Sequence, residues 1–215
     1  LINVPPRNVN LREGIIPKLV TEDGNLILTS TPLDFEIKEV VFGLKKGSFH
    51  GPDGFTNHFF KHFWEEIHHD VFNLVRHFYK GGSFTQGFNS QFITLIPKVE
   101  NVSDIIQFRP VELVDPIHKI IIKLLANSLA WVLNKIISLN QFGFVKGRNI
   151  QDLLVIALEC VNLLKRSTRG GNIVLKVDIM KAFDNMDWGF IFTVLLSFGF
   201  NSVFVNWIKN LLGSA

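Results

Sequence analysis

The feature that most constrains the fold is the largely apolar run Ile173–Val177, which ends in a carboxylate, Asp178. The run is rich in β-branched residues, and an amphipathic, helix-like segment comes after it. This order predicts a buried strand with Asp178 at its C-terminal tip, where α/β and α+β enzymes often hold their chemistry. A carboxylate there suits a hard cation such as Mg²⁺, although it can also simply cap the next turn.

Two more acidic residues, Asp184 and Asp187, come shortly after Asp178. Asp187 stands directly before Trp188, where it is expected to cap a helix. The three carboxylates could in principle share a cation, but on a strand–turn–helix path they point in different directions. The chain also contains no Asp-Asp dipeptide. The sequence therefore predicts one strand-end carboxylate and not a complete two-metal site.

Helical periodicity dominates the rest of the chain. Residues 1–30 are polar and turn-rich, so we expect a linker or a docking segment there, and Gly51–Gly54 predicts a tight turn in which Asp53 caps the next helix. A mostly helical chain with a few strands belongs to the α+β class. Helices are predicted over 31–44, 55–79, 115–136, 150–166, 187–198 and 202–212, and a strand over 91–97.

The composition excludes several classes of protein. A chain with 47% apolar residues and 21 Phe among 215 residues is not a disordered tail. Its net charge of +3 is compatible with nucleic acid without identifying it. The single cysteine, Cys160, excludes an internal disulfide framework and is expected to fill the core. No uncharged apolar run of about 18 residues occurs, so no membrane partner is predicted.

Basic residues stand at predicted turns. Lys98 comes after Pro97, Arg109 precedes Pro110, and Arg148 comes after Gly147. Loop-borne Lys and Arg beside Gly or Pro suit phosphate contacts, because the backbone can approach closely and Arg can bind two oxygens at once. Solvated charges remain the alternative, because loops are often basic.

Taken in order, short segments of this chain resemble the reverse transcriptase of LINE-type (non-LTR) retrotransposons, and plant elements most of all. Each segment is short, but together they keep the order and spacing of that family over about residues 30–210. The residues at Gly51–Gly54 and at Phe92–Lys98 favour the LINE type over the group II intron maturase type. The matching segments are 36–42, 51–55, 63–64, 92–98, 108–110, 118–120, 125–127, 141–148 and 175–184.

The resemblance implies a right-hand polymerase, with a fingers-like subdomain over 31–150 and the start of a palm over 151–215, ending before the Asp-Asp hairpin. It implies an RNA-directed DNA polymerase that uses an RNA template, a DNA primer, dNTPs and two Mg²⁺ ions, with Mn²⁺ as a substitute. An intracellular setting, in the nucleus or the cytoplasm, is implied by the same resemblance. It says nothing of protein partners.

The resemblance also assigns roles to individual residues. Asp178 matches the residue that binds both catalytic metal ions, and Phe183 matches the aromatic gate against ribonucleotides. Lys98 and Arg109 match residues of the fingers that grip the triphosphate. The positions matching a segment close to template and nucleotide are Gln141, Gly147 and Arg148.

The chain departs from the family at several positions. His118 stands where the family usually has an aromatic residue, and Glu112 replaces a small polar residue near the triphosphate-gripping positions. An acid there is expected to repel phosphate. Leu153 and Met180 replace an Asn and a small residue.

The paired-aspartate segment is missing from the chain, so we expect it to be inactive as a polymerase by itself. The alternative of another class is a non-catalytic retroelement relic or nucleic-acid-binding module.

Overall fold

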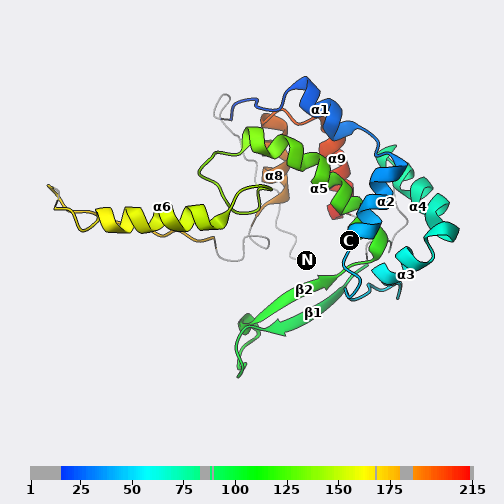
Figure 1. Cartoon of the computed structure of the whole chain (residues 1–215), viewed down its shortest axis with the longest axis horizontal. Coiled ribbons are helices and arrows are strands. Elements are labelled where there is room, and N and C mark those ends of the chain that lie inside the picture. The colour runs from blue at the N-terminus through cyan, green and yellow to red at the C-terminus, as the bar shows by residue number, and fades with distance from the viewer. Residues whose placement is uncertain (1–15, 83–87, 89, 168, 180–185, 214–215) are drawn as a thin grey trace. The chain divides into compact units, whose positions relative to one another are not determined.

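In the part of the chain that the structure describes, most of the regular structure is helical, as the periodicity predicts, and the strands form one β-hairpin (Figure 1). The computed structural model describes residues 16–82, 88, 90–167, 169–179 and 186–213. The α+β class is confirmed. The elements are α1 (Glu22–Thr29), α2 (Asp34–Gly43), α3 (Asn57–His62), α4 (Trp64–Tyr79), β1 (Phe92–Pro97), η1 (Ile105–Gln107), β2 (Phe108–Leu113), α5 (Pro116–Ile136), α6 (Ile150–Leu163), α8 (Trp188–Ser197) and α9 (Ser202–Gly213).

The contacts divide the chain into two units. The first comprises residues 1–24 and 130–200, and the second comprises residues 25–129 and 201–215. These units do not coincide with the boundaries predicted at residues 30 and 150. The assignment of fingers and palm to particular segments stays a prediction.

The core of the second unit is built from aromatic side chains of α4 and α9. The rings of Tyr79 and Trp207 lie 4.7 Å apart, and those of Phe78 and Trp207 lie 6.3 Å apart. Phe78 and Phe204 are almost fully buried. Offset and edge-on contacts of this kind stabilise aromatic pairs beyond the burial of their surface. This cluster joins the two separate chain segments of the unit, residues 25–129 and 201–215.

Helix α5 supplies the aliphatic part of the same core. Its predicted apolar face is confirmed, because Ile120, Ile121 and Leu124 are buried. By length and composition alone, α5 is also the one described helix that could cross a membrane. The buried residues Ile120, Ile121 and Leu124 of that face lie within the second unit.

Two predicted helix starts are wrong by a few residues. The helix predicted from Thr31 begins at Asp34, because Glu36 accepts a hydrogen bond from the backbone N–H of Leu33 (2.7 Å) and caps the helix there. The helix predicted over 55–79 is divided at Phe63, which leaves helical geometry at ψ 25°. The hydroxyl of Thr56, not Asp53, caps α3 by accepting from Phe59 N–H (3.3 Å).

The described part of the N-terminal segment contains one helix, because residues 22–29 form α1. The backbone N–H groups of Leu19 and Val20 both donate to the carbonyl of Phe198 (2.9 and 3.0 Å) within the first unit. The interpretation of residues 1–30 as a linker or docking segment stays a prediction. Residues 1–15 lie outside the described part of the chain.

The buried strand predicted before Asp178 is not observed. Residues 171–179 form no strand, and the side chains of Ile173 and Val177 are 91% and 77% exposed. A strand needs a neighbour to pair its N–H and C=O groups. Within the described residues the two strands β1 and β2 pair only with each other, and they belong to the other unit. Asp178 therefore lies on an exposed segment without regular secondary structure.

Helix α6 precedes this segment and is also uncovered. All its residues are exposed, although its apolar content is high, and Leu154 and Leu158 are examples. Cys160 is exposed on the same helix, so the prediction that it fills the core is wrong. The periodicity predicted the helix correctly, but it could not show what packs against it.

We expect Phe78→Ala to lower the free energy of unfolding by about 3–5 kcal/mol, because the truncation leaves a cavity beside Tyr79 and Trp207. Urea unfolding followed by tryptophan fluorescence measures the change. The matched control is Phe49→Ala, since Phe49 is 74% exposed and its truncation leaves no cavity. Equal losses in the two variants would contradict the described core.

Candidate functional site

The β-hairpin carries two of the residues expected to bind the nucleotide. Strands β1 and β2 are antiparallel, with Phe92 opposite Leu113 and Pro97 opposite Phe108. The predicted strand over 91–97 is confirmed. The strand β2 was not predicted, because Pro110 interrupts its pattern. A two-stranded hairpin tolerates that proline, since each strand has a free edge.

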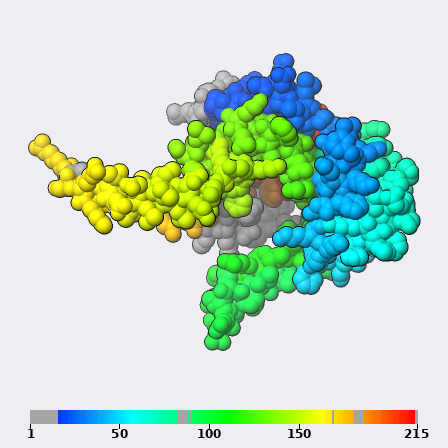
Figure 2. All heavy atoms as spheres, viewed as in Figure 1, coloured from blue at the N-terminus to red at the C-terminus, as the bar shows by residue number. Residues whose placement is uncertain are grey.

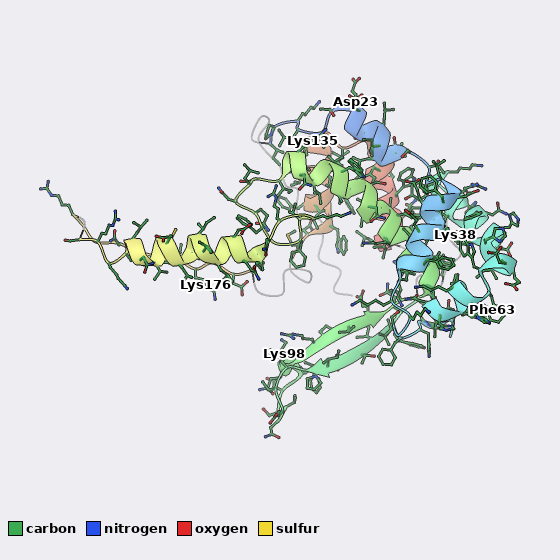
Figure 3. All side chains as sticks on the ribbon, in the orientation of Figure 1. Asp23, Lys38, Phe63, Lys98, Lys135 and Lys176 are labelled. Carbon is green, nitrogen blue, oxygen red and sulfur yellow. The ribbon has the colours of Figure 1, made fainter. Side chains whose placement is uncertain are left out.

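Lys98 and Arg109 lie on the same face of this hairpin. The backbone N–H of Lys98 donates to Gln107 O (2.8 Å), which continues the ladder one residue past Pro97. Arg109 lies opposite Ile96. Because side chains alternate between faces, Ile96, Lys98 and Arg109 share one face. The structure thus brings the two basic residues together, near the far end of the hairpin where Figure 3 labels Lys98.

The acidic residue that departs from the family lies on the other face. Glu112 is opposite Ile93, and both side chains point away from the face of Lys98 and Arg109. The expectation that Glu112 repels phosphate at these two residues therefore loses its geometric basis. Sequence spacing alone could not show this, because the register depends on how the hairpin closes.

Hydrogen bonds between residues close in sequence order the connection between β1 and β2. Asp104 accepts from Ile106 N–H (3.1 Å), and Gln107 accepts from Ser103 N–H (2.8 Å). The ammonium group of Lys98 donates to the carbonyl of Ile106 (3.0 Å). Lys98 is exposed and its ammonium group has further donors available. The hairpin end is thus a defined turn that holds a cation at the surface.

In the first unit, Arg148 ties the loop over residues 137–148 to the end of α5. Its guanidinium group donates to the carbonyls of Ile137 (2.9 Å), Gln141 (2.6 Å) and Ser138. A cation at a helix C-terminus also meets the negative end of the helix dipole. The sequence carried no specific signal for this role, and the predicted template contact of Arg148 stays a prediction.

The other two loop positions have local roles. Gly147 has φ +86°, a conformation that favours glycine, and a Cβ there would meet nothing within 4 Å. The side chain of Gln141 is exposed, and its backbone carbonyl is the one that accepts from Arg148. Gln141, Gly147 and Arg148 therefore lie in one hydrogen-bonded loop.

Asp178 stands apart from any described ligand set. Among the described residues it makes no hydrogen bond or ion pair, and no group of three His, Cys, Asp or Glu residues could hold a metal ion. Asp187 caps α8 as predicted, accepting from Phe190 N–H (2.7 Å). Phe183 and Asp184 lie outside the described residues. A single exposed carboxylate does not fit a dedicated Mg²⁺ site.

His118 fills a buried position near the hairpin. It is 5% exposed, and burial lowers the pKa of its imidazole, while the charge of Asp115 acts in the opposite direction. A neutral ring therefore occupies the position where an aromatic residue is usual. The buried position therefore accepts His118, because an uncharged imidazole ring can be buried as an aromatic ring can.

Comparison with known proteins defines the class. Residues 96–215 match the family described as reverse transcriptase (RNA-dependent DNA polymerase). This match covers more than half of the chain, and the chain belongs to that family. The match includes Lys98, Arg109, the 141–148 loop and Asp178.

The chain is also similar to a protein of Xenopus laevis named Transposon TX1 uncharacterized 149 kDa protein. The two are 29% identical over 165 residues, which is 77% of this chain and 12% of that protein. The resemblance to a retrotransposon reverse transcriptase of the LINE type is thereby confirmed. An origin in plants stays a prediction.

We expect Arg148→Ala to lower the free energy of unfolding by about 1–3 kcal/mol, since charge-assisted hydrogen bonds are lost. The free energy of unfolding of Arg148→Lys is expected to lie between those of the parent and of Arg148→Ala, because an ammonium group keeps the charge but cannot match the planar fork of guanidinium donors. Urea unfolding of the whole chain measures both losses. Lys146→Ala is the control, since Lys146 is exposed. A loss no larger than that of the control would exclude the capping role.

We expect His118→Phe to make stability less sensitive to acid. A His whose pKa is lowered by folding binds more protons when unfolded, so its contribution to stability rises with pH up to its ordinary value of 6.5. The urea midpoint of the parent chain should therefore fall more between pH 7.5 and 5, roughly across that titration, than the midpoint of the variant. His62→Phe, at an exposed position, is the control.

Proposed function

We propose that this chain is part of an RNA-directed DNA polymerase of a retrotransposon, in which the β1–β2 hairpin presents Lys98 and Arg109 to the triphosphate of the incoming dNTP. The shared face of these two cations, near the start of the family match, carries the proposal. A guanidinium group can bind two phosphate oxygens at once, and an ammonium group adds a point charge. Glu112 on the opposite face leaves that surface basic.

The remaining parts of the activity belong to the same proposal. Asp178 would contribute one carboxylate to a site for two Mg²⁺ ions, and Phe183 would exclude ribonucleotides. Gln141, Gly147 and Arg148 would border the RNA template and the DNA primer. The ions, when bound, would activate the primer hydroxyl and neutralise phosphate charge. Fingers up to residue 150, a palm from 151 and a nuclear or cytoplasmic location complete the proposal.

A non-catalytic nucleic-acid-binding role is the second candidate. One observation favours it: the described residues place one carboxylate, Asp178, on an exposed segment without a companion ligand. Such a chain could bind phosphate through Lys98 and Arg109 without chemistry.

The chain by itself is expected to give no Mg²⁺-dependent extension of a DNA primer on an RNA template. In the complete retroelement protein, Asp178→Asn should abolish extension while leaving primer–template binding largely intact. There, Lys98→Ala and Arg109→Ala should each raise the KM for dNTP by about 10-fold, because a charge-assisted hydrogen bond of about 1.5–3 kcal/mol is lost.

Glu112→Ala is the matched control, since it removes a charge from the other face of the same hairpin. Its KM should stay within about twofold of the parent value. Extension by the chain alone would contradict its expected inactivity. Near-normal extension by Asp178→Asn in the complete protein would remove Asp178 from its proposed role. A KM shift as large in Glu112→Ala as in Lys98→Ala would exclude the shared face of Lys98 and Arg109 as the contact for the triphosphate.

A further inference from the structure

The orientation of the hairpin depends mainly on contacts at its base. Most residues of β1 and β2 are exposed on both faces, and Ile93 is 66% exposed. In Figure 2 most of the hairpin (green) stands clear of the helices of its unit. Core packing along the strands therefore does not orient it. At one side of the base, only Val114 and Asp115 connect β2 to α5.

A turn distant in sequence lies against this connection. The backbone N–H of Asp53 donates to Oδ1 of Asp115 (3.1 Å), across 62 residues of sequence. The ammonium group of Lys119 donates to the carbonyl of Phe49 (3.0 Å), across 70 residues. Both bonds join the loop over 49–54 to the start of α5, one at the residue before the helix and one in its first turn.

Gly51 packs directly on the same connection. A Cβ at Gly51 would lie 2.1 Å from Oδ1 of Asp115 and 2.8 Å from the carbonyl carbon of Val114. The second neighbour is backbone, which cannot move aside as a flexible side chain can. Glycine is needed at position 51 because the two backbone segments approach each other closely there. The base of the hairpin has no room for a side chain at this point.

We propose that Asp115 is a positioning residue that, with Phe49, Gly51, Asp53 and Lys119, forms a turn–helix brace. The brace fixes the connection between β2 and α5, and so sets the direction in which the hairpin presents its face. The consequence for nucleotide binding rests on the function proposed above for Lys98 and Arg109. The brace itself does not depend on that function.

The charges around the brace make it sensitive to pH. Burial, followed by the neighbouring Asp115 carboxyl, raises the pKa of Asp53 to about 6, while the Phe55 N–H and His50 act in the opposite direction. The pKa of Lys119 is lowered by burial, while both acids oppose that change. His118 also faces Asp115 and has its pKa lowered by burial.

The sign of the effect is set by this direction. The pKa of Asp53 is higher in the folded chain than its ordinary value of 3.8, so its contribution to stability falls as the pH rises from about 4 to about 6. Once Asp53 has lost its proton, the two carboxylates repel each other. The brace should be tighter at pH 5 than at pH 7.5, values on either side of that pKa of about 6.

The experiment measures the direction of the hairpin within the second unit. Spin labels are placed at Thr94→Cys on the hairpin and Lys123→Cys on α5, both exposed, in a Cys160→Ser background that removes the single native cysteine. The distance distribution between the labels is recorded by pulsed electron paramagnetic resonance. The parent should give one narrow distribution that broadens from pH 5 to pH 7.5.

Asp115→Ala and Gly51→Ala should each about double the width of the distribution, since the base is then free to open locally. Asp115→Asn keeps the accepting oxygen and removes the charge, so its distribution should stay as narrow as that of the parent and depend less on pH. Gly47→Ala is the matched control, because a Cβ at Gly47 meets nothing within 4 Å.

Unchanged widths in Asp115→Ala and Gly51→Ala would overturn the brace. If those variants fail to fold, Asp115→Asn and the pH series decide, because a merely structural Asp115 would leave the width independent of pH.

Binding of dTTP to the unlabelled chain separates the brace from the proposed function. Asp115→Ala should weaken that binding by about 10-fold. If Lys98→Ala leaves dTTP binding unchanged, the triphosphate role fails, and the label distances still decide the brace.

Discussion

Burial of the apolar face of α5 is the constraint on which the described site depends. Ile120, Ile121 and Leu124 hold this helix in the core of the second unit. Where α5 begins, Asp115 and Lys119 contact the loop over residues 49–54 at the base of the hairpin. Apolar packing in the second unit thus positions groups whose own contacts are polar. In the first unit, carbonyls that follow Ile136, the last residue of α5, accept from Arg148.

The basic and acidic parts of the candidate site differ in how completely they are built. Lys98 and Arg109 share a face because the hairpin register places them there, and the register needs only local pairing. Asp178 lies on a segment without a pairing strand among the described residues. A cation pair on a hairpin can form from neighbouring residues, whereas a metal site needs ligands from several segments. The chain's membership of the reverse transcriptase family is established, and the two-metal reaction stays a proposal.

Much of the fold could be predicted from local patterns. The helices at α5, α6, α8 and α9 and the strand β1 lie where periodicity and capping residues indicated, and Asp187 caps α8 as expected. The errors arose where a local signal had a competitor. Glu36 moved the start of α2 past Thr31, and Thr56 capped α3 in place of Asp53. The strand β2 was not predicted, because Pro110 and two charged residues interrupt the alternation of apolar and polar residues that is typical of a strand.

The sequence by itself determined the family, the helical class and which residue types could meet phosphate or metal, because ordered motifs and periodicity are properties of the chain. Only the tertiary structure decided that Glu112 faces away from Arg109, that Arg148 caps α5, and that His118 is a buried, neutral ring. It also decided that the run before Asp178 is exposed. The physical reason is the same in each case. Register, capping and burial depend on partners that lie far away in sequence, and a single chain pattern does not specify them.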